Sequence, residues 1–191
     1  MIITISGSPG SGKSTVAKRL AETLDWQRHY VGGIRRKMAA EKGMTLAEYN
    51  QWSETHKEGD EIVDQEVKRL GEEENNLIVE GRTAFYFIPD SLKIYLFVTM
   101  EEGAKRIWST YEKNKEKRNE DKINSLDELV KSLKKREISD HKRYQKYYNL
   151  DIFDPNHYDL WLDATNMDKK QEFQAVYNFV KKNLDSKQNL S

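Results

Sequence analysis

Four short runs rich in apolar residues and a weaker one at 28–31 are spaced along the chain, and glycine-containing or charged segments separate them. The run at 1–6 is almost wholly apolar, and the run at 76–81 has a continuous apolar centre at Leu77, Ile78 and Val79. Such runs are typical of strands that are buried on both faces of a parallel sheet. We expect strands at MIITIS (1–6), RHYV (28–31), NLIVEG (76–81), LKIYLFVT (92–99) and YDLWLDAT (158–165).

The segments between these runs carry apolar residues at helical spacing. After the first strand, Val16, Leu20 and Leu24 fall on one helical face. The pairs Thr45/Glu48 and Ser125/Glu128 have the spacing of a helix N-cap. We expect helices at 13–24, 34–42, from 45 onward, and at 60–73, 101–111, 125–148 and 168–184. Alternating strands and helices predict an α/β fold in which helices cover both faces of a parallel sheet.

Composition narrows the possible functions. The chain has 191 residues, of which 37% are hydrophobic and 34% charged, enough for one domain. Its 32 basic and 32 acidic residues balance, whereas proteins that bind nucleic-acid backbones carry a basic excess. The absence of cysteine excludes disulfides and thiolate metal sites. With no membrane-length apolar run and no signal-peptide pattern, we expect a cytoplasmic monomer that binds neither nucleic acid nor a membrane.

A glycine-rich motif joins the first strand to the first helix. It fits G-x-x-x-x-G-K-[ST], a pattern that arises by chance in on the order of one chain in a hundred of this length. Its context between a strand and a helix makes a phosphate-binding loop (P-loop) the better interpretation. Glycines let backbone N–H groups surround the phosphates, Lys13 reaches the β- and γ-phosphates, and the Ser14 hydroxyl ligates Mg²⁺. The predicted ATP-binding residues are Gly7, Ser8, Pro9, Gly10, Ser11, Gly12, Lys13, Ser14 and Thr15.

Two pairs of charged residues outside this loop are candidates for holding a phosphorylated acceptor, because arginine grips phosphate with two hydrogen bonds. Arg35 and Arg36 are expected in the first turn of a helix, where an anionic ligand would offset their unfavourable position. A solvated basic face explains them equally well. Glu80 and Arg82 follow the third strand, at the sheet edge where open α/β folds bind ligands.

A third candidate lies on the long charged helix. Arg136, Asp140 and Arg143 are four and three residues apart, which places them on one face. Taken alone, this spacing favours a ladder of salt bridges over a binding site.

Together, these motifs resemble the cytidylate kinase family of nucleoside monophosphate kinases, in particular its short archaeal-type members. The likeness covers most of the chain, and the order in which these motifs follow one another is more specific than the P-loop alone. It includes the P-loop, G-x-I-x-R at 32–36, E-G-R at 80–82, IPDSLKIYLFV at 88–98, AKR at 104–106, R-x-x-x-D-x-x-R at 136–143, KRYQKYYNLDI at 142–152 and the strand at 158–165.

The resemblance implies a P-loop NTPase fold with a five-stranded parallel sheet, an acceptor-binding region at about 32–75 and a lid at about 112–145. The core would comprise 1–31, 76–111 and 150–185. The implied reaction is ATP + (d)CMP giving ADP + (d)CDP with Mg²⁺. The implied roles are acceptor-phosphate binding for Arg36 and Arg82, closure over the acceptor and the transferring group for Arg136, Asp140 and Arg143, and transfer chemistry for Lys13, Arg136 and Arg143. Glu80 would hold the metal indirectly, through water.

Departures from the family pattern lie on the acceptor side, at Val31, Gly33, Arg35 and Phe85. They bear on the choice of base more than on the reaction. Kinases acting on UMP, AMP or a non-nucleotide acceptor such as shikimate therefore stay open, as does a non-catalytic nucleotide-binding regulatory module. Three intact arginines on the acceptor side argue against the regulatory module, because a passive ATP binder has no use for them.

Overall fold

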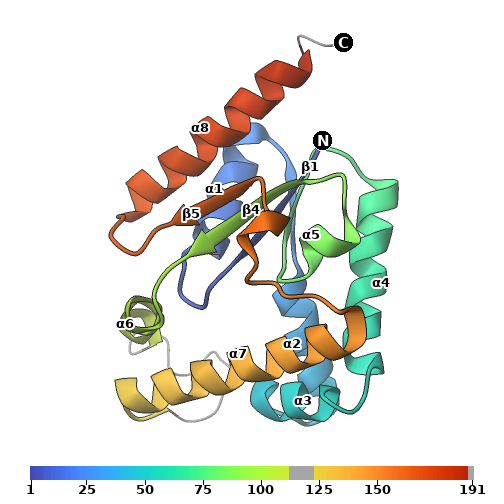
Figure 1. Ribbon diagram of the computed structural model, residues 1–191, viewed down its shortest axis with the longest axis vertical. Coiled ribbons are helices and arrows are strands. Elements are labelled where there is room, and N and C mark those ends of the chain that lie inside the picture. Colours follow the sequence, from blue (N-terminus) through green and yellow to red (C-terminus); the bar gives the residue numbers. More distant parts are fainter. Residues whose placement is uncertain (112–122, 189–191) are drawn as a thin grey trace.

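The computed structural model describes residues 1–111 and 123–188, which form a five-stranded parallel sheet in the order β2-β3-β1-β4-β5 (Figure 1). Every pair of neighbouring strands is parallel, which confirms the predicted α/β class. The strands are β1 (Ile2–Gly7), β2 (Gln27–Tyr30), β3 (Leu77–Glu80), β4 (Leu92–Phe97) and β5 (Leu160–Asp163).

The central strand β1 sets the position of the glycine-rich motif. All six of its residues are buried, between β3 on one side and β4 on the other. Ile5 is in register with Glu80 and Gly7 with Leu96. The carboxyl ends of β1 and β3 are therefore adjacent, and the loop after Gly7 begins beside Glu80.

Helices cover both faces of the sheet, as the alternation of elements predicts. On one face, α1 (Lys13–Leu24) and α8 (Lys169–Gln188) pack against β1 and β4 (Figure 1). On the other face, α4 (Glu58–Glu73) and the short α5 (Ala84–Phe87) cover β1 and β3. Buried aliphatic residues fill both layers: Ile3, Ile5, Leu20, Val176 and Val180 on the first, and Val63, Val67, Leu70, Leu77 and Val79 on the second.

Four further helices lie at the end of the sheet where the strands terminate. They are α2 (Val31–Glu41), α3 (Leu46–Ser53), α6 (Met100–Tyr111) and α7 (Leu126–Tyr148). The long helix α7 runs across this end (Figure 1), packing on α6 through Ala104, Leu129 and Leu133. It also contacts α3, so one helix spans both sides of the space above the strands.

The predicted helix boundaries agree with the structure to within two residues, except at the start of α2 and at the end of α8, which continues to Gln188 and not to 184. The Thr45/Glu48 capping box and the Ser125 cap are both present. The helix expected from residue 34 instead begins at Val31, directly after β2. Its two glycines leave room for the ring of Tyr30, since a Cβ at Gly32 would lie 2.8 Å from Tyr30 Cε2.

Two short elements, α5 and a 3₁₀ turn at Pro155–His157, were not predicted. The charged segment 112–122, which the expected lid includes, lies outside the described residues. Within the described ranges, none of the helices has the length and apolar character needed to span a bilayer.

Candidate active site

The glycine-rich motif forms the turn between β1 and α1. Gly10 and Gly12 have φ angles of 76° and 83°, left-handed conformations that favour glycine. A side chain at Gly10 would also collide with the backbone of Gly103 in α6. The N–H groups of Thr15 and Val16 both reach the carbonyl of Gly12, at 2.8 and 3.0 Å, so α1 starts directly at the motif. Its positive N-terminal end therefore faces the same space as the loop.

Lys13 lies among cations. Its Nζ donates to the carbonyl of Ser8 at 3.3 Å. Burial, together with the positive charges of Arg82, Arg136 and Arg36, lowers the pKa of Lys13 to about 7, against the opposing effect of Glu80. Burial disfavours the charged form of a lysine by itself, and here three arginine charges act in the same direction as burial. This part of the site therefore favours an anion.

Glu80 connects the motif to the edge of the sheet. Its Oε1 accepts a hydrogen bond from the Ser14 hydroxyl, and its Oε2 accepts one from Arg28 Nη2 at 2.6 Å. The carboxylate is only 1% exposed, and the ion pair with Arg28 balances its charge. Ser14 and Glu80, predicted from separate motifs, thus lie in direct contact.

Asp140 and Arg143 of the R-x-x-x-D-x-x-R motif take part in a buried ionic network. Asp140 accepts from Arg143 Nη2 through one oxygen and pairs with Arg82 through the other. Arg143, which is fully buried, also donates to Asp60 at 2.6 Å. Asp60 in turn accepts from Arg35 Nη1 at 2.6 Å. We refer to these five residues as the acceptor-side network, since it joins α2, α4 and α7 to the end of β3.

Arg35 and Arg36 occupy other positions in their helix than the sequence predicts. Because α2 begins at Val31, both lie in its second turn and not in its first. Arg35 is directed into the protein, where it bonds Asn50 at 2.8 Å and the carbonyl of Gly59 at 3.2 Å. Arg36 donates to the hydroxyl of Tyr30. The expected unfavourable position at a helix start is therefore wrong, because β2 continues into α2 without a loop.

A single cleft of about 1070 Å³ brings most of the predicted residues together. It is bounded by the P-loop, by α2, α3 and α4, and by the inward face of α7. Of the predicted site residues, it is lined by Pro9, Gly10, Gly12, Lys13, Ser14, Thr15, Arg36, Glu80, Arg82, Arg136 and Asp140. Gly7, Ser8, Ser11 and Arg143 are not among the lining residues, and Arg143 lies fully buried behind them as part of the acceptor-side network.

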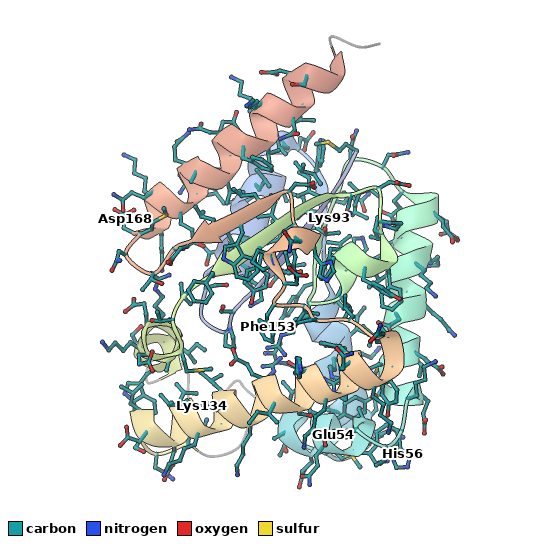
Figure 2. All side chains as sticks on the ribbon, in the orientation of Figure 1. Glu54, His56, Lys93, Lys134, Phe153 and Asp168 are labelled. Atoms are coloured by element: carbon teal, nitrogen blue, oxygen red, sulfur yellow. The ribbon has the colours of Figure 1, made fainter. Side chains whose placement is uncertain are left out.

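A smaller cavity adjoins this cleft under α7. Side chains fill the space between α7 and the sheet, where Figure 2 labels Phe153. Phe153 lines this cavity together with Arg82, Glu137 and Asp140. Of the departures from the family pattern, Val31 and Arg35 line the main cleft, whereas Phe85 packs with Tyr144 in an apolar cluster.

Several residues of the site were not predicted from the sequence. Arg28 and Asp60 are the partners of Glu80 and Arg143, and Asn50 is the partner of Arg35. Glu172 of α8 is 2% exposed, and its carboxylate lies against the P-loop, where a Cβ on Gly12 would be 2.7 Å from Oε1. No local pattern marks these residues, because each acts through a partner more than ten residues away.

Comparison with known proteins finds cytidylate kinases both among family models and among individual relatives. The family model described as "Cytidylate kinase-like family" matches residues 2–166. A cytidylate kinase of Methanocella arvoryzae is 39% identical over 180 residues, covering 94% of this chain and 97% of the relative. One of Archaeoglobus fulgidus is 35% identical over 181 residues, covering 94% of each. Among solved structures, shikimate kinase from Bacteroides thetaiotaomicron aligns with a TM-score of 0.62 at 14% identity, covering 97% of this chain and 98% of that one. This last likeness shows the P-loop kinase fold alone.

Proposed function

The chain belongs to the cytidylate kinase-like family and is a nucleoside monophosphate kinase, and we propose that it transfers the γ-phosphoryl group of ATP to CMP or dCMP. The products are ADP and CDP or dCDP. One observation carries the proposal: Lys13 lies within the electrostatic reach of three arginines in a cleft that the P-loop also lines. A donor and an acceptor phosphate together need this surplus of positive charge.

The donor side follows from the P-loop. The backbone from Gly7 to Thr15 would surround the ATP phosphates, and Lys13 would hold the oxygens of the transferred group. Binding of these anions raises the pKa of Lys13 toward its ordinary value, so the lysine is charged when the phosphates are present. The protein thereby stabilises the charge that develops in transfer.

A Mg²⁺ ion fits the residues present. In the described part of the chain, no cluster of three or more His, Asp or Glu could hold a metal alone. Mg²⁺ in kinases is held by one or two protein oxygens and by the substrate phosphates. The hydroxyl of Ser14 and, through water, the carboxylate of Glu80 would supply those oxygens. When bound, the ion would neutralise negative charge on the phosphates.

The acceptor side would use the cations across the cleft. Arg36 and Arg82 would bind the phosphate of the monophosphate, and Arg136 would neutralise the group in transfer. Asp140 and Arg143 would act behind them, since their contacts orient Arg82 and join it to Asp60. We assign about 32–75 as the acceptor-binding region, about 112–145 as the lid, and 1–31, 76–111 and 150–185 as the core. The acceptor phosphate is already a competent nucleophile, so the reaction needs no general base.

A coupled assay of ADP formation across acceptors tests the proposal. We expect turnover with CMP and dCMP well above that with UMP, AMP, GMP or shikimate, and only in the presence of Mg²⁺. ADP formation that does not depend on any added monophosphate would contradict it. A preference for shikimate would show that the chain shares more than a fold with that kinase.

A further inference from the structure

One part of the cleft has the composition of a pocket for a flat ring with a polar edge. Where α2, α4 and α7 meet, Val31, Val63 and Tyr144 provide apolar walls, and Asp60 and Asp64 lie beside them. The two aspartates are four residues apart on α4, so they occupy the same face, one turn apart. A pyrimidine would fit between such walls with its hydrogen-bonding edge on the aspartates.

The two carboxylates differ in what they can still bind. Asp60 accepts from Arg143 through both oxygens and from Arg35 through Oδ1. Both oxygens of Asp60 are therefore engaged by the two arginines. The Asp64 carboxyl accepts one hydrogen bond, from the Tyr148 hydroxyl to Oδ2, and has no other hydrogen-bond partner among the described residues. Its Oδ1 is available to a ligand.

The environment of Asp64 also calls for a donor. The residue is 6% exposed and lines the cleft, and no ion pair within the described residues neutralises it. Burial, with the nearby charge of Asp60, raises the pKa of Asp64 to about 7 against the lowering effects of the Tyr148 hydrogen bond, Arg35 and Lys68. A buried carboxylate with one donor is under-satisfied, so a ligand N–H placed at Oδ1 would be favourable.

We propose that Asp64 binds the exocyclic amine of the acceptor's base and thereby selects cytosine over uracil, an inference that rests on the function proposed above. At position 4 cytosine carries an amine that donates, whereas uracil carries a carbonyl oxygen that accepts. Against cytosine, Oδ1 of Asp64 gains a hydrogen bond. Against uracil, the ionised carboxylate of Asp64 and the carbonyl oxygen are two acceptors with no proton between them, and a site built for the bond rejects such an analogue.

Tyr148 makes the proposal testable by a single substitution. In Asp64→Asn the amide would keep its carbonyl oxygen on the Tyr148 hydroxyl, because that hydroxyl is a donor. The amide nitrogen must then take the position of Oδ1. This nitrogen donates to the uracil carbonyl and has nothing to accept from the cytosine amine, so the preference should reverse in sign.

The experiment compares kcat/KM for CMP and UMP in the unaltered protein, in Asp64→Asn and in Glu61→Gln. Glu61 is a matched control on the same helix, exposed to solvent and paired with Lys57 at 3.2 Å. We expect Asp64→Asn to lower the CMP-to-UMP ratio by about 100-fold, with kcat/KM for UMP rising, and Glu61→Gln to leave the ratio unchanged. A CMP analogue with hydrogen in place of the 4-amino group should lose about 100-fold with the unaltered protein.

Two results would overturn the inference. One is an unchanged CMP-to-UMP ratio of kcat/KM in Asp64→Asn, provided that this variant has the same Tm as Glu61→Gln and is therefore folded. The other is an equal fall of the ratio in both variants. Should Asp64→Asn fail to fold, the analogue decides, since equal kcat/KM with and without the amine excludes recognition of that group. Calorimetric measurement of CMP and UMP binding tests base selection by Asp64 separately from the proposed phosphoryl transfer. Tighter binding of CMP without turnover would refute the reaction and leave base selection standing, whereas turnover with no base preference would do the reverse.

Discussion

Replacing Asp140 with alanine should destabilise the protein and slow transfer to every acceptor alike. Asp140 is 2% exposed and joins Arg82 to Arg143. Arg143 retains Asp60 when the carboxylate is removed. Arg82 does not have a second ion pair among the described residues, so its guanidinium loses the contact that fixes its direction.

The size of the effect follows from burial. Removing one partner of a buried ion pair costs about 3–5 kcal/mol of unfolding free energy. We expect the lower end, about 3 kcal/mol, because Arg143 keeps Asp60 and the Arg82 side chain is 15% exposed to the cleft. In a chain of this length, that corresponds to a fall in Tm of about 6–12 °C. Loss of orientation at Arg82 should lower kcat by about 10- to 100-fold.

Thermal unfolding and a coupled assay with CMP and dCMP measure both effects. Asp127→Ala is the matched control, since Asp127 is an exposed carboxylate at the start of the same helix. A Tm and kcat within the range of this control would refute the orienting role and leave a surface-like salt bridge. A change of more than about tenfold in the CMP-to-dCMP ratio, with kcat for dCMP unaffected, would instead assign Asp140 to recognition of the sugar hydroxyl.

Two further predictions concern the two ends of the cleft, and a third concerns the buried Glu172 of α8. Lys13→Ala should lower kcat by about 10³-fold or more with the Tm retained, and near-normal turnover at saturating ATP would exclude a role in transfer. Arg36→Ala and Arg82→Ala should raise KM for the monophosphate or lower kcat with little change in ATP affinity; a loss confined to ATP binding would show that the roles are reversed. Burial raises the pKa of Glu172 to about 7 from 4.5, so the folded state binds the extra proton and stability falls as the pH rises from about 4.5 to 7. Glu172→Gln should remove this loss, which amounts to about 3 kcal/mol at most, and so melt higher than the unaltered protein at pH 8 but not at pH 4.5; equal Tm differences at both pH values would contradict it.

Local patterns were sufficient to predict the framework of the fold. Continuous apolar runs mark strands buried on both faces, and a capping box such as Thr45/Glu48 marks a helix start within four residues. The P-loop is also local, because its glycines, lysine and serine are contiguous. The start of α2 was misplaced because its local pattern is misleading. Glycine normally interrupts a helix, whereas Gly32 lies inside α2 and makes room for the ring of Tyr30.

The rest of the site depends on partners far apart in the chain. Asp60 lies among charged residues in the first turn of α4, where acidic side chains commonly serve only the helix N-terminus. Its partner Arg143 is 83 residues away and belongs to a helix face that reads equally well as a solvated salt-bridge ladder. The pairing of Asp60 with Arg143 could not be predicted from the sequence, because the charge of a side chain does not specify which opposite charge the fold brings to it.

The arrangement of charges explains how a chain with zero net charge can attract highly charged substrates. Steering depends on the local field, and the carboxylates here are not spread evenly. Asp60 and Asp140 engage Arg35, Arg143 and Arg82, whereas Lys13 is buried and the charges of Arg82, Arg136 and Arg36 help burial to lower its pKa to about 7. The network thus fixes the arginines before substrate arrives and leaves its excess positive charge where the phosphates would bind. Such preorganisation reduces the reorganisation that transfer requires, which is the principal way proteins accelerate this chemistry.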